Sequence, residues 1–262
     1  MKSTDTPHSG IKHKTVAIQK CIETGARHPL SHFDSRRYVQ HNLALGDGLG
    51  PLLAFLDSLP AGSSRVQPLR AFEDGDISFA HLEYFLAPMG HVVGFEVHRW
   101  DDGRIVEHWD NLQPLSEVPN SSGRTMTDGP TESDEPERTA ENKTKVERFL
   151  SRVLIDGRTD DVAEYFYSNR LLQHSPTYGD GVAALVRTLD QGRRDGSLLY
   201  QRVHRVLGEG AFCLAMSEGL AGGEPASFYD LFRLQGGKIV EHWDVVERIP
   251  PRHEWRNDNG KF

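Results

Sequence analysis

The sequence predicts an α+β protein that contains two tandem copies of one domain, and three observations support this prediction. Residues 103–110 read Gly-Arg-Ile-Val-Glu-His-Trp-Asp, and residues 237–244 repeat them with Lys in place of Arg. The Gln-His pair at residues 40–41 returns at residues 173–174, so both motifs recur at nearly the same distance along the chain. In each copy, helical patterns come first and strand patterns follow, which is typical of α+β folds.

The helical patterns lie at the start of each copy. Residues 11–24 have helical periodicity and end at Gly25, a residue suited to the left-handed conformation that ends many helices. Residues 49–59 form a second pattern, which Pro60 stops. The matching patterns of the second copy cover residues 142–155, 160–167 and 182–189.

Strand patterns follow the helices. In the first copy they cover residues 66–72, 77–86, 92–100 and 104–112. Asp-Gly at residues 74–75 and 102–103, and Gly-Gly at residues 236–237, supply turns between strands. One curved antiparallel sheet wrapped around the helices would give each copy a single pocket.

Residues 116–139 separate the copies and differ from them in composition. They are rich in Ser, Gly, Pro and acidic residues, a composition that cannot offset its ordering entropy by burial. We therefore expect a first domain over residues 11–118, a flexible acidic linker over residues 119–139 and a second domain over residues 140–255.

Composition and charge exclude several classes of protein. Of the 262 residues, 37% are hydrophobic and 26% are charged, and the formal net charge is −8. The basic face that nucleic acid or an anionic membrane requires is therefore not expected. No apolar run approaches the roughly 18–20 residues of a membrane span, and the N-terminus does not resemble a signal peptide. Two cysteines cannot build a disulfide framework. The expectation is a cytoplasmic protein that binds neither nucleic acid nor membrane.

The last hairpin of each copy predicts which side chains share a face of the sheet. If residues 235–237 form a three-residue turn, Asp230 lies opposite His242 and Phe228 lies opposite Asp244. One face then carries Phe228, Asp230, Phe232, Val240, His242 and Asp244. The other face carries Tyr229, Leu231, Arg233, Ile239, Glu241 and Trp243. The same register in the first copy groups Glu96, His98, Val106, His108 and Asp110. A two-residue turn would shift the register by one and break these groups.

These motifs resemble the SnoaL-like branch of the nuclear transport factor two-like superfamily. The resemblance rests on Gln-His-Asn at residues 40–42, Gly-Phe-Glu-Val-His-Arg at residues 94–99 and the repeated motif that ends in Trp-Asp. The sequence is most similar to the predicted SnoaL-like aldol-condensation group, whose Asp-x-Phe-Arg motif appears at residues 230–233. The resemblance implies two cone-shaped α+β barrels, each with an internal cavity, that pair through the outer faces of their sheets. The superfamily includes polyketide cyclases, ketosteroid isomerase, epoxide hydrolases and binding proteins, so the fold does not decide the chemistry.

Two aspartates are the expected general bases. Carboxylates and imidazoles on an apolar face are costly to bury without a function. We expect Asp110 and Asp244 to take a proton from a carbon next to a carbonyl group. The resemblance implies the same role, because an aspartate that ends the last strand is the acid/base candidate in SnoaL-type cyclases.

Four histidines are the expected partners of these aspartates. His41 and His174, at the helical side of the pocket, are expected to donate to the developing enolate oxygen. His108 and His242 are expected to set the protonation of the aspartates or to orient the substrate. This chemistry requires no metal and no cofactor. The structural alternatives are strand-end caps for the aspartates and hydrogen-bonded core residues for the histidines.

The remaining candidates line or flank the pocket. The expected ligand-binding residues are Glu96, Asp230, His81, His98, Phe228 and Phe232. The histidines of the first copy raise a metal-site hypothesis, but they lack a spacing such as His-x-Glu-x-x-His, so no metal is expected. Glu107, Glu241, Trp109 and Trp243 are expected on the outer face as surface or interface residues.

The preferred functional hypothesis is a cofactor-independent proton-transfer enzyme, an aldol-type cyclase or an isomerase. Its substrate would be a small or polyketide-like hydrophobic carbonyl compound. The two domains would form an intramolecular pseudo-dimer through their tryptophan faces, with further self-association left open. One alternative is a non-catalytic small-molecule-binding module. Another is an epoxide-type hydrolase, which an Asp-Arg-Asp relay would support, but Arg99 and Arg233 fall on the outer face.

Overall fold

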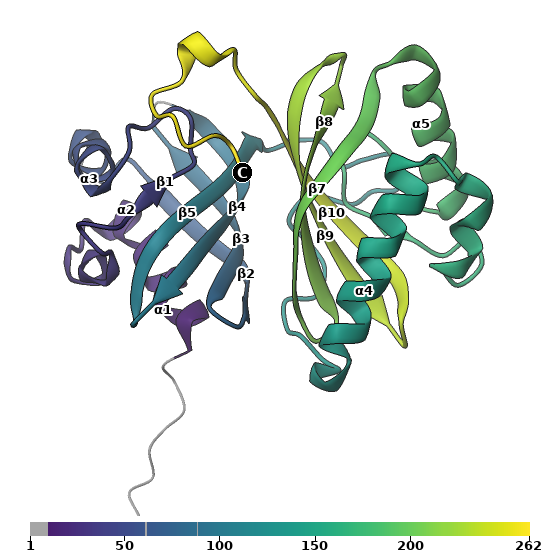
Figure 1. Cartoon of the computed structure of the whole chain (residues 1–262), viewed down its shortest axis with the longest axis horizontal. Coiled ribbons are helices and arrows are strands. Elements are labelled where there is room, and N and C mark those ends of the chain that lie inside the picture. The colour runs from purple at the N-terminus through teal and green to yellow at the C-terminus, as the bar shows by residue number, and fades with distance from the viewer. Residues whose placement is uncertain (1–9, 61, 88) are drawn as a thin grey trace, which may run out of the picture.

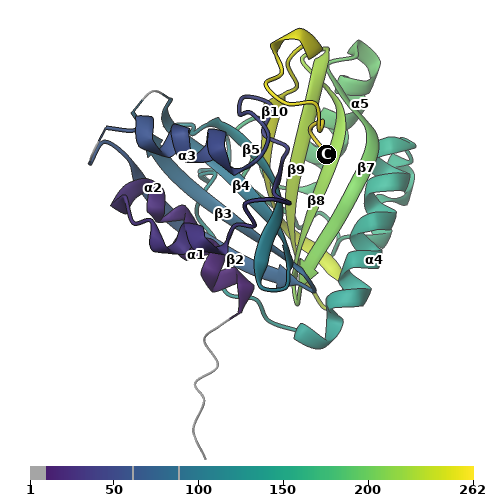
Figure 2. The same cartoon turned by 60° about the vertical axis from the view of Figure 1, so that its left-hand side comes forward.

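The computed structural model describes residues 10–60, 62–87 and 89–262, and it contains two α+β halves. Two curved sheets stand back to back in the middle of the molecule, and the helices lie on their far sides (Figures 1 and 2). The first half consists of α1 (Ile11–Gln19), α2 (Cys21–Thr24), η1 (His28–His32), β1 (Val39–Gln40), α3 (Leu49–Ser58), β2 (Arg65–Asp74), β3 (Ile77–Leu86), β4 (Gly90–Asp101) and β5 (Arg104–Pro114). The second half consists of η2 (Pro136–Arg138), α4 (Thr139–Phe149), η3 (Leu150–Ile155), η4 (Thr159–Glu164), β6 (Leu172–Gln173), α5 (Val182–Asp195), β7 (Leu198–Glu209), β8 (Phe212–Ala221), β9 (Glu224–Gln235), β10 (Lys238–Arg248) and η5 (Arg252–Glu254).

The two sheets have the same topology. The strand order is β1-β5-β4-β3-β2 in the first half and β6-β10-β9-β8-β7 in the second. The long strands pair antiparallel, and the two-residue strands β1 and β6 pair parallel with β5 and β10. The predicted α+β class is therefore confirmed, with one mixed five-stranded sheet in each half.

The last hairpin of each half differs from the predicted one. Gly236 and Gly237 form a two-residue turn with φ of +54° and +74°, so Lys238 pairs with Gln235 rather than with Leu234. A bulge at Val240 then shifts the register by one more residue. Together the turn and the bulge displace the partners by two residues. Side chains beyond the bulge therefore point to the predicted faces of the sheet.

The corrected register changes the partners but keeps the group. Asp244 lies opposite Asp230 rather than Phe228, and His242 lies opposite Phe232. In the first half, Glu96 lies opposite Asp110 and His98 opposite His108. The bulges also correct one expectation, because Ile105 and Ile239, and not Val106 and Val240, enter the inner cores.

A shared apolar core joins the outer faces of the two sheets. Trp109 and Trp243 are 2% and 1% exposed and belong to one buried cluster that draws residues from both halves, including Phe79, Phe95, Phe212 and Leu231. The guanidinium of Arg70 lies 4.4 Å from the ring centre of Trp243, and that of Arg205 lies 4.8 Å from Trp109. Each half thus places an arginine over the tryptophan of the other, as in an isologous dimer.

The segment between the halves is packed rather than detached, which corrects the expected flexible linker. Met126 is buried in the shared core. The side-chain amide of Asn120 donates to the backbone carbonyls of Gln173, Ser175 and Tyr178 at 2.6, 3.1 and 3.2 Å. These polar contacts, which composition does not reveal, hold the segment in place.

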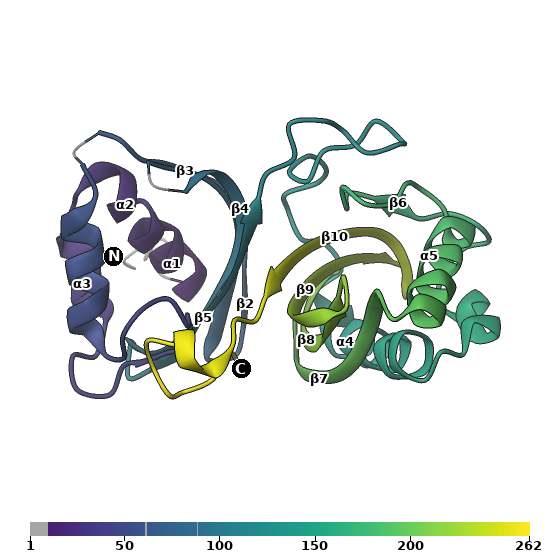
Figure 3. The ribbon, with the colours of Figure 1, turned by 90° about the horizontal axis from the view of Figure 1, so that it is seen from above.

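The C-terminal tail makes the reciprocal crossing. After β10 the chain, yellow in Figures 1 and 3, runs over to the first half. The amide of Asn257 donates to the backbone carbonyls of Asn42 and Leu45 at 2.8 and 2.9 Å. Each half is therefore clamped by the segment that follows the last strand of the other half.

Among the described residues, no helix is long and apolar enough to cross a membrane.

Candidate functional site

The first half contains a mostly apolar cavity of about 160 Å³ between its helices and its sheet. Its walls come chiefly from Ile18, Leu30, Phe33, Leu52, Phe55 and Leu112. Its polar lining consists of Gln19, Tyr38, Asn42, Tyr84, Glu96, His98, His108 and Asp110. An apolar cleft with a few convergent polar groups is the usual form of a small-molecule site.

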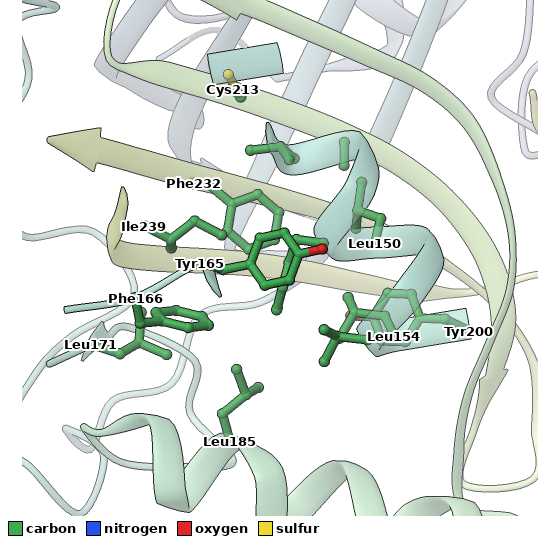
Figure 4. Close-up of a cluster of buried hydrophobic side chains, with 14 of the residues drawn as sticks. Leu150, Leu154, Tyr165, Phe166, Leu171, Leu185, Tyr200, Cys213, Phe232 and Ile239 are labelled. Atoms are coloured by element: carbon green, nitrogen blue, oxygen red, sulfur yellow. The ribbon is translucent and has the colours of Figure 1, made fainter. Parts of the chain in front are cut away.

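The corresponding space of the second half is filled. Only about 10 Å³ remains, roughly the room of a single water molecule. Figure 4 shows the side chains that occupy this region, among them Leu154, Tyr200 and Phe232. Helix α5 buries Val182, Leu185 and Leu189, whereas α3, its counterpart in the first half, has no fully buried residue. The closer packing of α5 explains why the cavities differ.

A chain of hydrogen bonds crosses the base of the first cavity. Gln40 Oε1 accepts a hydrogen bond from the backbone N–H of Asn42 at 2.9 Å, which identifies this atom as the oxygen of the side-chain amide. Because an oxygen can only accept here, His108 Nδ1, at 2.8 Å from it, must be the donor. His108 Nε2 then faces Glu96 Oε2 at 2.6 Å. Burial by itself lowers the pKa of His108, but the hydrogen bond and the charge of Glu96 raise it above its usual value.

Two further residues complete the surroundings of Glu96. The Tyr84 hydroxyl donates to Oε1 at 2.7 Å, and the Gln19 amide donates to Oε2 at 3.1 Å. Both carboxylate oxygens are therefore occupied. Burial, followed by the charge of Glu96, raises the pKa of Tyr84 well above its usual value, so this tyrosine stays a donor.

Asp110 is held differently. Its Oδ2 accepts from the amide of Asn42 at 2.6 Å. Its Oδ1 makes no hydrogen bond with any described residue. Lys261 of the C-terminal tail lies near this oxygen, with its Nζ 3.7 Å from Oδ1 and 2.9 Å from Glu247 Oε2. Asn42 thus fixes Oδ2, whereas Oδ1 is enclosed by the protein and lies near the ammonium of Lys261.

The second half repeats this chain of hydrogen bonds but lacks an open cavity. His242 bonds to Gln173 Oε1 at 2.9 Å and to Asp230 Oδ1 at 3.0 Å, and Tyr200 donates to the same Oδ1 at 3.1 Å. Asp244 accepts from the Tyr178 hydroxyl at 3.1 Å, and burial raises the pKa of its carboxyl. Asp230, Phe232 and His242 line the small remaining space, but Asp244 does not.

The expected place of His41 and His174 at the pocket is corrected by the structure. β1 pairs with β5 so that Gln40 lies opposite His108, and alternation then turns His41 to the outer face. There His41 stacks on Trp109 at 4.9 Å, and its Nε2 lies 3.0 Å from Glu107 Oε1. His174 repeats these contacts with Trp243 at 4.5 Å and with Glu241 Oε1 at 2.8 Å. Both histidines support the interface and contact neither cavity.

Two expected ligand-binding residues also lie elsewhere. His81 stacks on Phe95 at 4.4 Å and bonds to Arg70 Nη1 at 2.9 Å, on the interface side of β3. Phe228 packs on Tyr200 at 4.4 Å in the filled core. His81 therefore faces the interface, whereas Phe228 faces the inner core of the second half, where no open cavity remains.

Several side chains that hold the polar groups of the first cavity were not predicted from the sequence. Gln40, Asn42, Gln19 and Tyr84 position the imidazole and the carboxylates of the first half. The signal for Gln40 was the repeated Gln-His pair, in which the glutamine and not the histidine faces inward. No local signal indicates Lys261, because only the tail crossing brings it to Asp110.

One group of side chains has the residue types of a metal site. Within the described part of the chain, Glu96, His98 and His108 offer donor atoms that all lie within 4.8 Å of one another. The hydrogen bond between His108 and Glu96 already joins two of these donors.

No protein-family profile and no curated protein matches the chain. Among solved structures, the chain is similar to a candidate ketosteroid isomerase from Kribbella flavida, at 16% identity and a TM-score of 0.37, with 44% of this chain and 84% of that chain covered. It is similar to a candidate SnoaL-like polyketide cyclase from Jannaschia sp., at 19% identity and a TM-score of 0.35, with coverage of 45% and 92%. It is also similar to an epoxide hydrolase from M. tuberculosis, at 20% identity and a TM-score of 0.34, with coverage of 42% and 85%. These proteins include the SnoaL-like group that the sequence motifs resemble, and each spans less than half of this chain.

Proposed function

We propose that the first half is a small-molecule site that catalyses proton transfer next to a carbonyl group, as an aldol-type cyclase or an isomerase does. The observation that carries the proposal is the contrast between the halves. Both halves contain a histidine hydrogen-bonded to a carboxylate, but only the first half combines this pair with an apolar cavity of about 160 Å³. The second half then serves as a built-in partner.

Asp110 is the general base in this proposal. Its side chain lines the cavity, and Asn42 fixes the orientation of its carboxylate through Oδ2. The carboxylate takes a proton from the carbon next to the carbonyl group, and the electron pair of the C–H bond moves into the enolate. The enolate regains the proton at another carbon in an isomerisation or attacks a second carbonyl group in an aldol cyclisation.

The hydrolase alternative lacks its arginine. None of the described residues that line the first cavity is an arginine. Arg99 donates to Glu107 at 2.7 Å on the outer face, and Arg233 does the same to Glu241. An Asp-Arg-Asp relay is therefore not available at the cavity.

The binding-module alternative has one observation in its favour. Glu96 and His108 satisfy each other and their neighbours, so much of the polar lining is already paired. A pocket that only holds a ligand would need no available base, and the loss of Asp110 would leave its function intact.

The test is solvent-deuterium exchange at the positions next to the carbonyl groups of a panel of small ketones. Wild type is expected to exchange, and Asp110→Asn is expected to lose about 10²-fold or more of the rate. Asp244→Asn is the matched control, because the second cavity is filled, and it should keep the wild-type rate. Ketones that bind to wild type without exchange above buffer would contradict the enzyme and favour the binding module.

A further inference from the structure

His98 is a buried imidazole that makes no hydrogen bond within the described part of the chain. Its residue is 1% exposed, and it lines the first cavity. Its Nδ1 is enclosed without a partner, and among the described residues none makes a hydrogen bond with its ring. Its contacts are a stack on His108 at 4.8 Å and an edge contact with Phe33 at 6.3 Å. Buried polar groups in proteins normally have a hydrogen-bond partner, which a bound ligand can supply here.

The second half shows what this position holds where no ligand fits. The counterpart of His98 is Phe232, which lies opposite His242 as His98 lies opposite His108. Phe232 stacks on His242 at 4.8 Å and 24°, and His98 stacks on His108 at 4.8 Å and 30°. The packing is the same with either ring, so packing does not require the nitrogens of His98.

We propose that His98 donates a hydrogen bond to the carbonyl oxygen of the ligand, and that the ligand is a small enolisable ketone with a single ring. This inference rests on the proposed function, since it names the substrate class of that site. The enclosed Nδ1 leaves Nε2 as the nitrogen that a ligand can reach.

The size of the cavity limits the ring system. An engineered apolar cavity of about 150 Å³ holds a benzene molecule, and the first cavity measures about 160 Å³. Its aliphatic and aromatic walls suit one hydrocarbon ring, and its polar base suits one carbonyl group. A fused polycyclic ketone would require α3 to move away from the sheet.

The protonation of His98 agrees with a donor role. Burial, followed by the charge of His108, lowers the pKa of His98 well below its usual value. The neutral ring has one N–H, which can remain on Nε2 throughout the reaction. Asp110 then receives the proton from carbon, the negative charge develops on the oxygen that His98 holds, and His98 itself neither gains nor loses a proton.

The first experiment measures binding alone. Acetophenone and α-methylstyrene have nearly the same shape, but the second has a methylene group in place of the carbonyl oxygen. The ratio of the two Kd values should favour acetophenone about 3–10-fold more in wild type than in His98→Phe, the scale of one hydrogen bond. Phe is the residue that the second half carries at this position, so His98→Phe removes the donor and keeps the packing. His98→Gln, which retains a donor, should recover part of the preference.

Turnover separates this proposal from the proposed function. If acetophenone exchanges deuterium, His98→Phe should lower the rate by about 10²-fold, as the loss of one oxyanion donor does. Absent exchange combined with a preference that depends on His98 would overturn the enzyme but not the ligand contact. An equal preference in wild type and His98→Phe would overturn the contact.

A titration with Zn²⁺ alone tests the other partner that His98 could have. If wild type binds one equivalent and His98→Phe binds none, His98 is a metal ligand with Glu96 and His108, and the ketone contact is wrong. No binding by either protein agrees with the proposal.

Discussion

Asp110 and Asp244 end the same motif but have different neighbours. Asp110 lies beside an open cavity and 3.7 Å from the ammonium of Lys261. Asp244 lies in a filled core, where it accepts a hydrogen bond from the neutral hydroxyl of Tyr178. A buried carboxylate without a nearby lysine costs stability when it ionises.

Asp244→Asn should therefore stabilise the protein at neutral pH. Burial raises the pKa of Asp244 in the folded state, so the folded protein holds the proton more tightly than the unfolded chain. The cost is absent below the unfolded-state pKa and grows as the pH rises through the folded-state pKa. We expect Tm to rise by about 1–3 °C at pH 7, with a smaller rise at pH 4, in thermal unfolding followed by circular dichroism. A lower Tm at pH 7 would contradict this account.

The residues of the site were partly predictable. Alternation along β4 and β5 was enough to group Glu96, His108 and Asp110, because they are close in sequence on one hairpin. The side on which His41 lies depends on its pairing with a distant strand, which no local pattern reveals. Whether the imidazole of His98 has a hydrogen-bond partner depends on which side chains the whole fold brings to it, and no local pattern reveals this.

At the scale of elements, the segment after β5 binds the second half, and the segment after β10 binds the first half in the same way. Asn120 binds the carbonyl of Gln173 in β6 and two carbonyls of the loop that follows, and Asn257 binds two carbonyls of the loop after β1. The loop that Asn257 holds contains Asn42, which in turn holds Asp110.

Asn257→Ala and Asn120→Ala should separate stability from function. Asn120→Ala removes the donor of three buried or partly buried carbonyls, and Asn257→Ala removes the donor of two partly buried ones, so each should lower the free energy of unfolding by about 1–3 kcal/mol. Asn257→Ala should also slow deuterium exchange several-fold, because it loosens the loop beside Asp110, while Asn120→Ala should leave exchange unchanged. Denaturant melts and exchange rates on the same samples decide the matter. Equal exchange rates in the two variants would show that the tail does not support the site.

The elements themselves were more predictable than the connections. Gly25 ends the first helical region with φ of +68°, as its position suggests. Helix α5 runs six residues beyond its expected end, through Gly192, because a side chain there would collide with Leu198 and the glycine permits close packing. The bulges at Val106 and Val240 have no sequence signal, since valine is an ordinary strand residue.

At the scale of the molecule, two arginines occupy equivalent positions but differ in burial. Arg70 lies over Trp243, is almost fully buried, donates to the carbonyl of Pro130 at 2.7 Å and contacts His81. Burial lowers its pKa to about 10, so it remains charged at neutral pH. Arg205 lies over Trp109 and is half-buried.

Arg70→Ala should destabilise the protein far more than Arg205→Ala. The first variant leaves the carbonyl of Pro130 and the buried imidazole of His81 without their donor, at a cost of about 2–4 kcal/mol. The second loses chiefly a cation–π contact, worth about 0.5–1 kcal/mol. Urea unfolding followed by tryptophan fluorescence and by circular dichroism measures both. Because the core is shared, both probes should give one coincident transition, and two separated transitions would mean that the halves fold independently.

The covalent joining of the halves has a consequence for how this pair can change. When two identical subunits assemble, a single gene specifies both, and every substitution appears at two places related by the axis. Here each position is encoded once, so a phenylalanine can replace a histidine in one barrel while the other keeps its imidazole. A substitution that changes the packing of one half therefore leaves the residues of the other half unchanged. Protein engineers can therefore redesign the filled barrel for rigidity without rewriting the open one.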